Sequence, residues 1–256
     1  MKSIFYGLAL GIQFFTVIPL HQSFPMNRQT TTAMYGTFPF IGLLIGTAVY
    51  SVTSGLMQLE FTPLFIAIVT ILTSIVLTGG LHVDGWVDVS DAFFSYRDKE
   101  KRHEILEDPR TGAFGVISVI CLLLAKVAVV YEIINRQPDH LWVIIFIPII
   151  ARMSVVFFFL NTPAMKEKGI AFYFKSTVSM KGLSVWLTFY IVVLSVVSVI
   201  SKQYVLLGFI LCALIVCLLL KRFVLKHFGG MNGDVLGALS EGMEVILWSI
   251  VLLQFI

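Results

Sequence analysis

The chain has 256 residues, of which 58% are hydrophobic and only 13% are charged, and its mean hydropathy is +0.93. Soluble globular domains carry about 25% charged residues, and no polar stretch here is long enough to build one, so lipid is the expected solvent. The formal net charge of +3 is small and dispersed, which argues against a nucleic-acid partner.

Repeated apolar runs predict an all-α, polytopic transmembrane helical bundle that forms a single integral membrane domain, residues 1–256. A bilayer core of about 30 Å needs roughly 20 apolar residues per helix. The first run lacks a small-residue cleavage site, so it is interpreted as a span and not as a signal peptide. Eight spans are predicted, at about 4–20, 36–57, 62–81, 113–134, 141–160, 183–200, 203–220 and 243–256. The last run is short, and a helix that begins near Asp234 would complete it.

Positive charges fall in alternate connections between these spans. Thirteen of the 18 lysines and arginines lie in four of them, 21–35, 82–112, 161–182 and 221–242. The other connections and both termini carry three, namely Lys2, Arg136 and Lys202. Because cytoplasmic connections are enriched in lysine and arginine, we expect the four basic connections in the cytoplasm and both termini outside.

The connection 82–112 opens with three aspartates, Asp84, Asp88 and Asp91, at spacing i, i+4 and i+7. This spacing places them on one stripe of a helix. Three like charges destabilise a helix unless a cation lies between them, and carboxylate oxygens suit Mg²⁺ or Mn²⁺. The alternative is an acidic, solvated helix at the membrane surface, but the intervening residues, such as Trp86, are apolar. The stripe therefore predicts a metal site, and the whole connection is a candidate catalytic segment.

The same connection continues through Glu104 to Asp108 and Arg110. Acidic metal ligands followed by an arginine are a pairing that phosphate chemistry uses, because the metal and the arginine share the charge on the transferring oxygens. Arg110 could equally anchor a lipid headgroup, and both interpretations stay open. His82 differs from the other isolated histidines because it lies two residues before Asp84.

A second constellation lies in the Gly/Asp-rich connection 221–242. Glycines such as Gly230 and Gly233 precede Asp234, and they would let the backbone approach a phosphate at a helix N-terminus. Small residues also serve close helix packing in membranes, so the pattern is weak alone. A further stripe follows at i, i+3, i+7 and i+10, formed by Asp234, Gly237, Glu241 and Glu244. The expected cytoplasmic side of both acidic connections favours one shared site.

Lys126 and Arg152 lie inside apolar runs. An ionisable residue at the centre of a span costs roughly 2.5–3.5 kcal/mol on insertion scales unless it is paired or hydrated. Two interpretations are open: interhelical ion pairs with a structural role, or side chains that line a polar cavity and receive an anionic group.

Four blocks of the chain resemble the cobalamin synthase family, also called adenosylcobinamide-GDP ribazoletransferase or cobalamin-5′-phosphate synthase. Its acidic signature is matched by Gly79-Gly80-Leu81-His82-Val83-Asp84-Gly85 with Asp88 and Asp91, and its second block by Glu104 through Asp108-x-Arg110 and Gly112. Its C-terminal block is matched by Gly229-Gly230 with Gly233-Asp234-x-Leu236-Gly237-Ala238, and its second span by Phe38-Pro39-x-Ile41-Gly42-Leu43-x-Ile45-Gly46. The blocks occur in order over nearly the whole chain.

Three positions depart from the family pattern. The stretch after the first span, Thr16-Val17-Ile18-Pro19, lacks the arginine of Thr-Arg-x-Pro, which puts in doubt a phosphate-binding role for the first connection. Ala92 stands where a glycine is usual, and Asn232 stands where a threonine is usual. These two changes are milder.

The resemblance implies a multispan bacterial inner-membrane enzyme with its site facing the cytoplasm. It would transfer the cobinamide phosphate group of adenosylcobinamide-GDP to α-ribazole or its 5′-phosphate and release GMP, with Mg²⁺, or else Mn²⁺, as cofactor. Its other implied partners are the lipid bilayer and further late enzymes of cobalamin assembly.

A residue-level hypothesis follows from the resemblance. The metal would be held by Asp84, Asp88, Asp91 and Asp108, and charge on the phosphates would be neutralised by Arg110, Lys126 and Arg152. The proton of the attacking hydroxyl would pass to Asp91 or, as second choice, to Asp234. Further substrate or phosphate contacts are assigned to His82, Glu104, Gly230, Gly233, Gly237 and Glu241.

Two other functions remain open from the sequence. A CDP-alcohol phosphotransferase also gathers aspartates at the end of a span, but its typical Ala-Arg after the early aspartate pair and its later pair are absent here. A secondary transporter would carry its charges near the midplane and show an internal repeat. Here no repeat is seen, and the acidic residues collect at one face.

Overall fold

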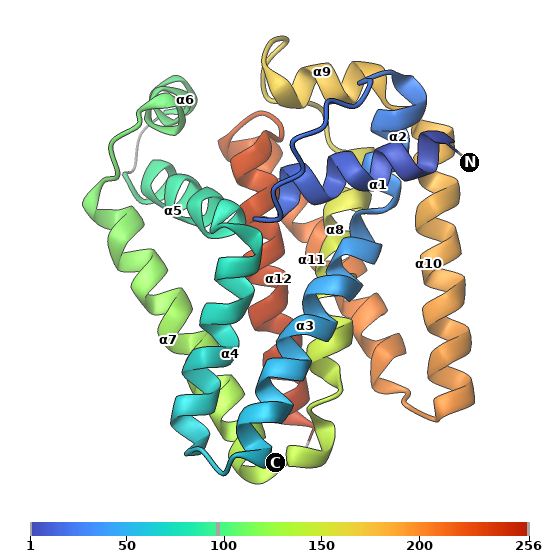
Figure 1. Ribbon diagram of the computed structural model, residues 1–256. Coiled ribbons are helices and arrows are strands. Elements are labelled where there is room, and N and C mark those ends of the chain that lie inside the picture. Colours follow the sequence, from blue (N-terminus) through green and yellow to red (C-terminus); the bar gives the residue numbers. More distant parts are fainter. Residues whose placement is uncertain (1, 96–97, 255–256) are drawn as a thin grey trace.

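The computed structural model describes residues 2–95 and 98–254, and apart from one isolated β-bridge its regular elements in these ranges are helices (Figure 1). The all-helical prediction is confirmed. The helices are α1 (Lys2–Phe15), α2 (Arg28–Gly36), α3 (Phe38–Gln58), α4 (Pro63–Thr78), α5 (Leu81–Phe94), α6 (Lys99–Glu107), α7 (Ala113–Arg136), η1 (Pro138–His140), α8 (Val143–Asn161), α9 (Ile170–Thr177), α10 (Met180–Ser201), α11 (Val205–His227) and α12 (Gly233–Leu253).

Six helical segments of the described ranges are long and apolar enough to cross a membrane. They are α2 with α3 taken together, α7, α8, α10, α11 and α12, and α4 adds a seventh if the bent pair α4–α5 is counted as one span. α12 begins at Gly233, which confirms the prediction that the last helix begins near Asp234. α8 is the central helix, since most of its side chains are buried against its neighbours.

The expected first span, residues 4–20, differs from the structure. α1 ends at Phe15 after 14 residues, so it is about 21 Å long and does not cover a 30 Å bilayer core. Pro19 cannot continue a helix and disfavours a helical residue before it, so the apolar run after Phe15 is not helical. α1 instead runs across one end of the bundle beside α2 (Figure 1).

The short α1 changes the expected topology. The N-terminus and the C-terminus lie at opposite ends of the bundle (Figure 1), which differs from the expectation of both termini on one side. The N-terminal end also carries the connections that contain α5, α6 and α9. In the described ranges, the connections 82–112 and 161–182 carry eight lysines and arginines at this end. α1 begins there with Lys2, whereas α7 ends with Arg136 at the opposite end.

A sharp corner separates α4 from α5. Gly79 and Gly80 both have positive φ, 64° and 73°, which L side chains rarely adopt and glycine adopts freely. The two helix axes are bent by 94°, so α4 forms the membrane-crossing part and α5 runs across the end of the bundle (Figure 1). The expected span 62–81 therefore ends at this corner, and the aspartate stripe begins on a new helix.

α5 lies directly against the start of α12. A Cβ at Gly85 would lie 2.6 Å from the carbonyl oxygen of Asp234, and one at Gly237 would lie 3.1 Å from the carbonyl oxygen of His82. At Gly85 a side chain would force the backbones apart, and at Gly237 it would require a smaller shift of α5, so both glycines favour this close contact. This packing brings the first acidic stripe to the N-terminus of α12, as the sequence predicted.

Candidate active site

A cavity of about 520 Å³ lies at the end of the bundle that carries α1, α5, α6 and α9, beside the start of α12. Five of the site residues predicted from sequence line it: His82, Asp84, Gly233, Asp234 and Gly237. A volume of this size falls within the range of about 300–1,000 Å³ that is typical of small-molecule sites. The cavity is therefore the place to examine for chemistry.

Four carboxylates gather near this cavity, those of Asp84, Asp88, Asp91 and Asp234. Asp84 and Asp88 lie on α5, which is helical as the spacing predicted, and Asp234 lies on the first turn of α12. The pKa of the half-buried Asp88 is raised to about 6 by burial and by the negative charges of Asp84, Asp234 and Asp91. In the described part of the chain none of the four forms an ion pair. The cluster thus carries negative charge that no side chain neutralises.

Asp91 is held differently from the other members of the cluster. One of its carboxylate oxygens accepts a hydrogen bond from the backbone N–H of Gly115, at 3.2 Å, at the start of α7. A Cβ at Gly112 would collide with that carboxylate. A carboxylate is stabilised at a helix N-terminus by the free N–H groups and the helix dipole, and Asp91 does not line the cavity. Its position suits anchoring α7 better than accepting a proton from a substrate.

The donor set can be tested against Mg²⁺. Within residues 2–95 and 98–254, no three His, Cys, Asp or Glu side chains are grouped closely enough to hold a metal ion. Mg²⁺, however, is usually bound through one or two carboxylates, with waters and substrate phosphates completing its shell. Asp84 lines the cavity, and Asp88 lies one turn further along α5. In the described ranges neither has a cationic partner, so hard oxygen donors are present in the number that this arrangement needs.

Leu106 and Glu107 of the second block line the cavity, but the residues of this block that were predicted to act in the site do not. Asp108 accepts hydrogen bonds from Nε and Nη2 of Arg110, at 3.0 and 2.8 Å, and this contact lowers the pKa of Asp108 to about 2. The Arg110 side chain is 87% exposed. Glu104 pairs with Lys101 on the surface of α6. None of the three predicted residues lines the cavity.

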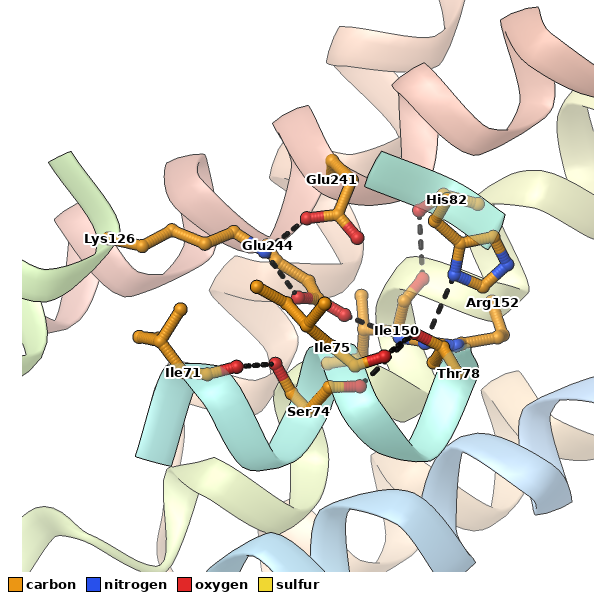
Figure 2. A network of polar contacts seen from close by, with 11 residues as sticks. Ile71, Ser74, Ile75, Thr78, His82, Lys126, Ile150, Arg152, Glu241 and Glu244 are labelled. Atoms are coloured by element: carbon orange, nitrogen blue, oxygen red, sulfur yellow. Dashed lines mark hydrogen bonds and ion pairs between the residues drawn. The ribbon is translucent and has the colours of Figure 1, made fainter. Parts of the chain in front are cut away.

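Lys126 and Arg152 belong to a buried network of ion pairs (Figure 2). Nζ of Lys126 on α7 lies 2.5 Å from Glu241 and 2.8 Å from Glu244, both on α12. Arg152 on α8 donates from Nη1 to Glu244. Both basic side chains are only 2% exposed, and neither lines the cavity. Of the two interpretations left open by the sequence, the structure gives interhelical ion pairs.

His82 connects this network to the cavity. Its Nδ1 lies 3.4 Å from Nη2 of Arg152 (Figure 2), and its side chain lines the cavity. A guanidinium group can only donate hydrogen bonds, so Nδ1 of His82 accepts. The neutral imidazole then carries its proton on Nε2, a tautomer assigned from the hydrogen bond. His82 is therefore available as a hydrogen-bond donor to a bound ligand.

Two lysines that the sequence reasoning used only for orientation, Lys166 and Lys168, line the cavity. Lys166 donates to Glu107 at 2.7 Å, whereas Lys168 has no ion-pair partner in the described ranges. A β-bridge between Ala164 and Met231 holds their loop against the start of α12. The signal in the sequence was the density of charge in 161–182, but which of these charges face the cavity depends on how the loop packs against the start of α12.

The glycines of the C-terminal block divide into two kinds. A Cβ at Gly230 would lie 2.7 Å from the backbone of Ala164, so Gly230 permits the close contact between the two loops, as Gly237 does between helices. Gly233 has open space around it and lines the cavity, which leaves it able to approach a ligand. Close packing, one interpretation of the glycine pattern, therefore applies at Gly230, and approach to a phosphate, the other, stays open at Gly233.

Asn232, where the family usually has threonine, caps α12. Its side-chain oxygen accepts from the backbone N–H of Val235 at 2.9 Å, and its Nδ2 donates to Asp234 at 2.6 Å. Threonine can also cap a helix, so the substitution keeps the helix start. The amide additionally fixes the orientation of the Asp234 carboxylate.

Comparisons with known proteins agree with the resemblance drawn from the sequence. The family model described as cobalamin-5-phosphate synthase matches residues 7–252. Relatives named adenosylcobinamide-GDP ribazoletransferase include those of Geobacillus sp. (strain WCH70), 36% identical, and Geobacillus thermodenitrificans, 37% identical, each covering 98% of this chain and 97% of the relative. The relative from Clostridioides difficile is 35% identical and covers 93% of both chains.

No solved structure matches the chain. The family match spans nearly the whole sequence, and the relatives match end to end at more than 30% identity. The chain therefore belongs to the cobalamin-5-phosphate synthase family.

Proposed function

We propose that this family member transfers the cobinamide phosphate group of adenosylcobinamide-GDP to α-ribazole, or to its 5′-phosphate, and releases GMP. The activity named for its relatives supports the substrates. The observation that carries the proposal is the cavity itself, where Asp84 and Asp234 and the unpaired Lys168 line one space. Unbalanced charges of both signs in one cavity suit a substrate that brings phosphates and a cation.

The reaction is a substitution at phosphorus. A ribose hydroxyl of the acceptor attacks the phosphorus that carries the cobinamide, a new P–O bond forms, and the P–O bond to GMP breaks. The hydroxyl proton must pass to a base, and the negative charge that develops on the leaving GMP must be stabilised. Phosphoryl transfer depends mainly on such positioning and charge stabilisation.

The residues that line the cavity can meet these needs. Asp234 is our candidate for the proton acceptor, because it faces the cavity and Asn232 orients it. Lys168, assisted by Lys166, would neutralise the pyrophosphate and then the leaving GMP. His82 would donate from Nε2 to a phosphate oxygen. Asp91, Arg110, Lys126 and Arg152 have no direct contact with substrate in this proposal.

Asp84 and Asp88 would hold the Mg²⁺, with Mn²⁺ as the alternative, and substrate phosphates would complete the set of ligands. When bound, such an ion stabilises charge on the transferring oxygens. Burial and, to a smaller extent, the neighbouring aspartates raise the pKa of Asp88, and the cation would relieve the repulsion among these carboxylates.

We further propose that the cavity faces the cytoplasm of a bacterial inner membrane. The basic residues collect at the cavity end of the bundle, as the positive-inside rule requires of a cytoplasmic face. This side is also where a nucleotide-activated substrate would be supplied.

A direct assay tests the proposal. Protein in nanodiscs is supplied with adenosylcobinamide-GDP and α-ribazole, with Mg²⁺ or with a chelator, and GMP is measured. We expect GMP release that needs both substrates and metal and that falls by about 10²–10³-fold in Asp84→Asn. Asp139→Asn, which changes a carboxylate at the other end of the bundle, is the matched control. Wild-type rates in Asp84→Asn would refute the proposed site, and uptake into liposomes without GMP would favour a transporter.

A further inference from the structure

The cavity has a second wall, which is aromatic and carries no charge. It is formed by Phe14, Phe15, Tyr35, Phe38 and Phe174, from α1, α2, α3 and α9. The rings hold one another in place, since Tyr35 meets Phe174 edge to face at 5.5 Å between centroids and Phe15 meets Phe38 at 4.1 Å. Such a wall offers a rigid apolar surface for a flat ligand group.

Two polar atoms at or beside this wall, the Tyr35 hydroxyl and Nε2 of His82, have no hydrogen-bond partner among the described residues. Tyr35 is only 5% exposed and lines the cavity, and its hydroxyl makes no hydrogen bond to any described residue. His82 is 4% exposed, and of its two ring nitrogens only Nδ1 is bonded, to Arg152. In Figure 2 the second ring nitrogen of His82 points away from Arg152. Neither atom is fully enclosed by protein, and both residues line the cavity. Because polar groups of buried residues are almost always hydrogen-bonded, these two atoms point to a ligand in the cavity that completes them.

We infer that the aromatic wall is the subsite for the base of the acceptor nucleoside, with the Tyr35 hydroxyl donating a hydrogen bond to an accepting ring nitrogen of that base. The inference rests on the proposed function. The ligand class is a nucleoside whose base is a fused, largely apolar bicycle with one free ring nitrogen. A benzimidazole base, as in α-ribazole, has this form.

The donor substrate fits this wall less well. Guanine exposes N7 and O6 as acceptors and its amino group as a donor, and a wall with two polar atoms would leave several of these groups unpaired. The corrinoid is several times larger than a nucleoside, and a cavity of about 520 Å³ cannot enclose it. The acceptor is the reactant that this space can hold.

The position of His82 indicates how a bound nucleoside would be oriented in the cavity. Its ring meets Phe38 at 6.0 Å in an edge-to-face contact, and it lies one helical half-turn before Asp84 on α5. The aromatic wall therefore adjoins the acidic cluster at His82. A nucleoside with its base on the wall would direct its ribose hydroxyls toward the carboxylates, where the proposed attack takes place.

The variant Tyr35→Phe removes only the hydroxyl and keeps the ring. We expect the KM for α-ribazole to rise about 3- to 10-fold, which corresponds to the loss of one neutral hydrogen bond. The kcat and the KM for adenosylcobinamide-GDP should stay unchanged. Tyr204→Phe, at the exposed Tyr204 between α10 and α11, is the matched control. A rise in the KM for adenosylcobinamide-GDP alone would overturn the inference.

An acceptor analogue makes the test specific for the proposed bond. An indole ribonucleoside lacks the accepting ring nitrogen, so the wild-type protein should bind it about 3- to 10-fold more weakly than α-ribazole. Tyr35→Phe should bind both nucleosides equally well, because the bond is already lost. If Tyr35→Phe still bound the indole nucleoside more weakly than α-ribazole, by the same factor as the wild type, Tyr35 would not contact that nitrogen.

Calorimetry with α-ribazole alone separates this inference from the proposed reaction. If the wild-type protein binds α-ribazole, Tyr35→Phe binds it more weakly, and no GMP is released, the subsite stands and the reaction is refuted. If GMP is released normally and neither the binding nor the KM of α-ribazole changes in Tyr35→Phe, the subsite is refuted and the reaction stands.

Discussion

Helix α12 contributes carboxylates to two groups of charged side chains, and the two groups balance their charge in opposite ways. Deep in the bundle, Glu241 and Glu244 meet Lys126 and Arg152 in direct ion pairs. At the end of the helix, Asp234 meets other aspartates and the amide of Asn232. In the first group each charge has a partner of opposite sign, whereas in the second no side chain of the described ranges neutralises the negative charge.

The difference follows from the surroundings of each group. An isolated charge inside the bilayer is expensive, so both basic side chains of the network have carboxylate partners. At the cavity, water and ligands can reach Asp84 and Asp234. Burial together with the negative charges of its neighbours raises the pKa of Asp88. We propose that the network supports the fold and that the acidic cluster serves binding and chemistry. The predictions below test this division.

The largest expected effect is on activity at the acidic cluster. Asp234→Asn should lower kcat for GMP release by about 10²–10⁴-fold, because the proposed proton acceptor is lost. Its thermal unfolding should stay close to that of the wild type, since no ion pair is broken. Both properties are measured on the same nanodisc preparation, with Asp139→Asn as control. A large loss of stability without a specific loss of kcat would assign Asp234 to the fold instead.

The network should respond in the opposite sense. Glu244→Gln leaves Arg152 without its carboxylate partner, and we expect it to lower the free energy of unfolding by about 3–5 kcal/mol. The matched control is Glu132→Gln, which breaks a surface pair with Arg136 and should cost at most about 0.5 kcal/mol. Unfolding in detergent gives both values. Equal losses in the two variants would contradict a structural role for the network.

Lys168 should affect substrate binding and leave stability unchanged. We expect Lys168→Met to raise the KM for adenosylcobinamide-GDP about 10-fold, because a charged contact to phosphate is lost. The KM for α-ribazole should not change. Lys181→Met, at an exposed lysine of α10 outside the cavity, is the control. A rise confined to the KM for α-ribazole would place the pyrophosphate elsewhere.

The smallest effect concerns pH. Asp88 has a folded-state pKa of about 6 against an ordinary value of 3.8, so between these values the folded protein binds more protons than the unfolded one. Without metal, stability should therefore fall as the pH rises from about 4 to about 6. The change should be about 1 kcal/mol or less, because Asp88 is only half-buried and its interactions are screened.

Thermal unfolding in a chelator at pH 4.5 and pH 7 measures this change. Asp88→Asn should flatten the dependence, and Mg²⁺ should restore stability at pH 7. If the metal-free protein gained stability on raising the pH through this window, and Asp88→Asn did so equally, the aspartates would not be repelling one another as described.

Much of the fold and of the site can be read from local patterns. The helical spacing of Asp84, Asp88 and Asp91 depends only on the geometry of one helix, and α5 has that helix. The start of α12 near Asp234 follows from a cap and an apolar run. The family blocks point to the same two segments. The exception is α1, because hydropathy alone does not show where the helix before Pro19 ends.

The partner of each charge could not be read from the sequence. Lys126 and Glu241 are 115 residues apart, and their pairing depends on how α7 packs against α12. Lys166 and Lys168 line the cavity, in a loop that a β-bridge ties to Met231, far along the chain. Arg110, which the motif made a candidate, pairs with Asp108 on the surface.

The sequence by itself determined that the chain is a helical membrane protein, where its acidic stripes lie and to which family it belongs. Periodicity, hydropathy and motif order are properties of neighbouring residues, so these conclusions need no packing. The tertiary structure decided which charges are neutralised and which remain open to a ligand. That distinction depends on distances between helices far apart in the chain, and it separates the residues that hold the fold from those we propose to bind and react.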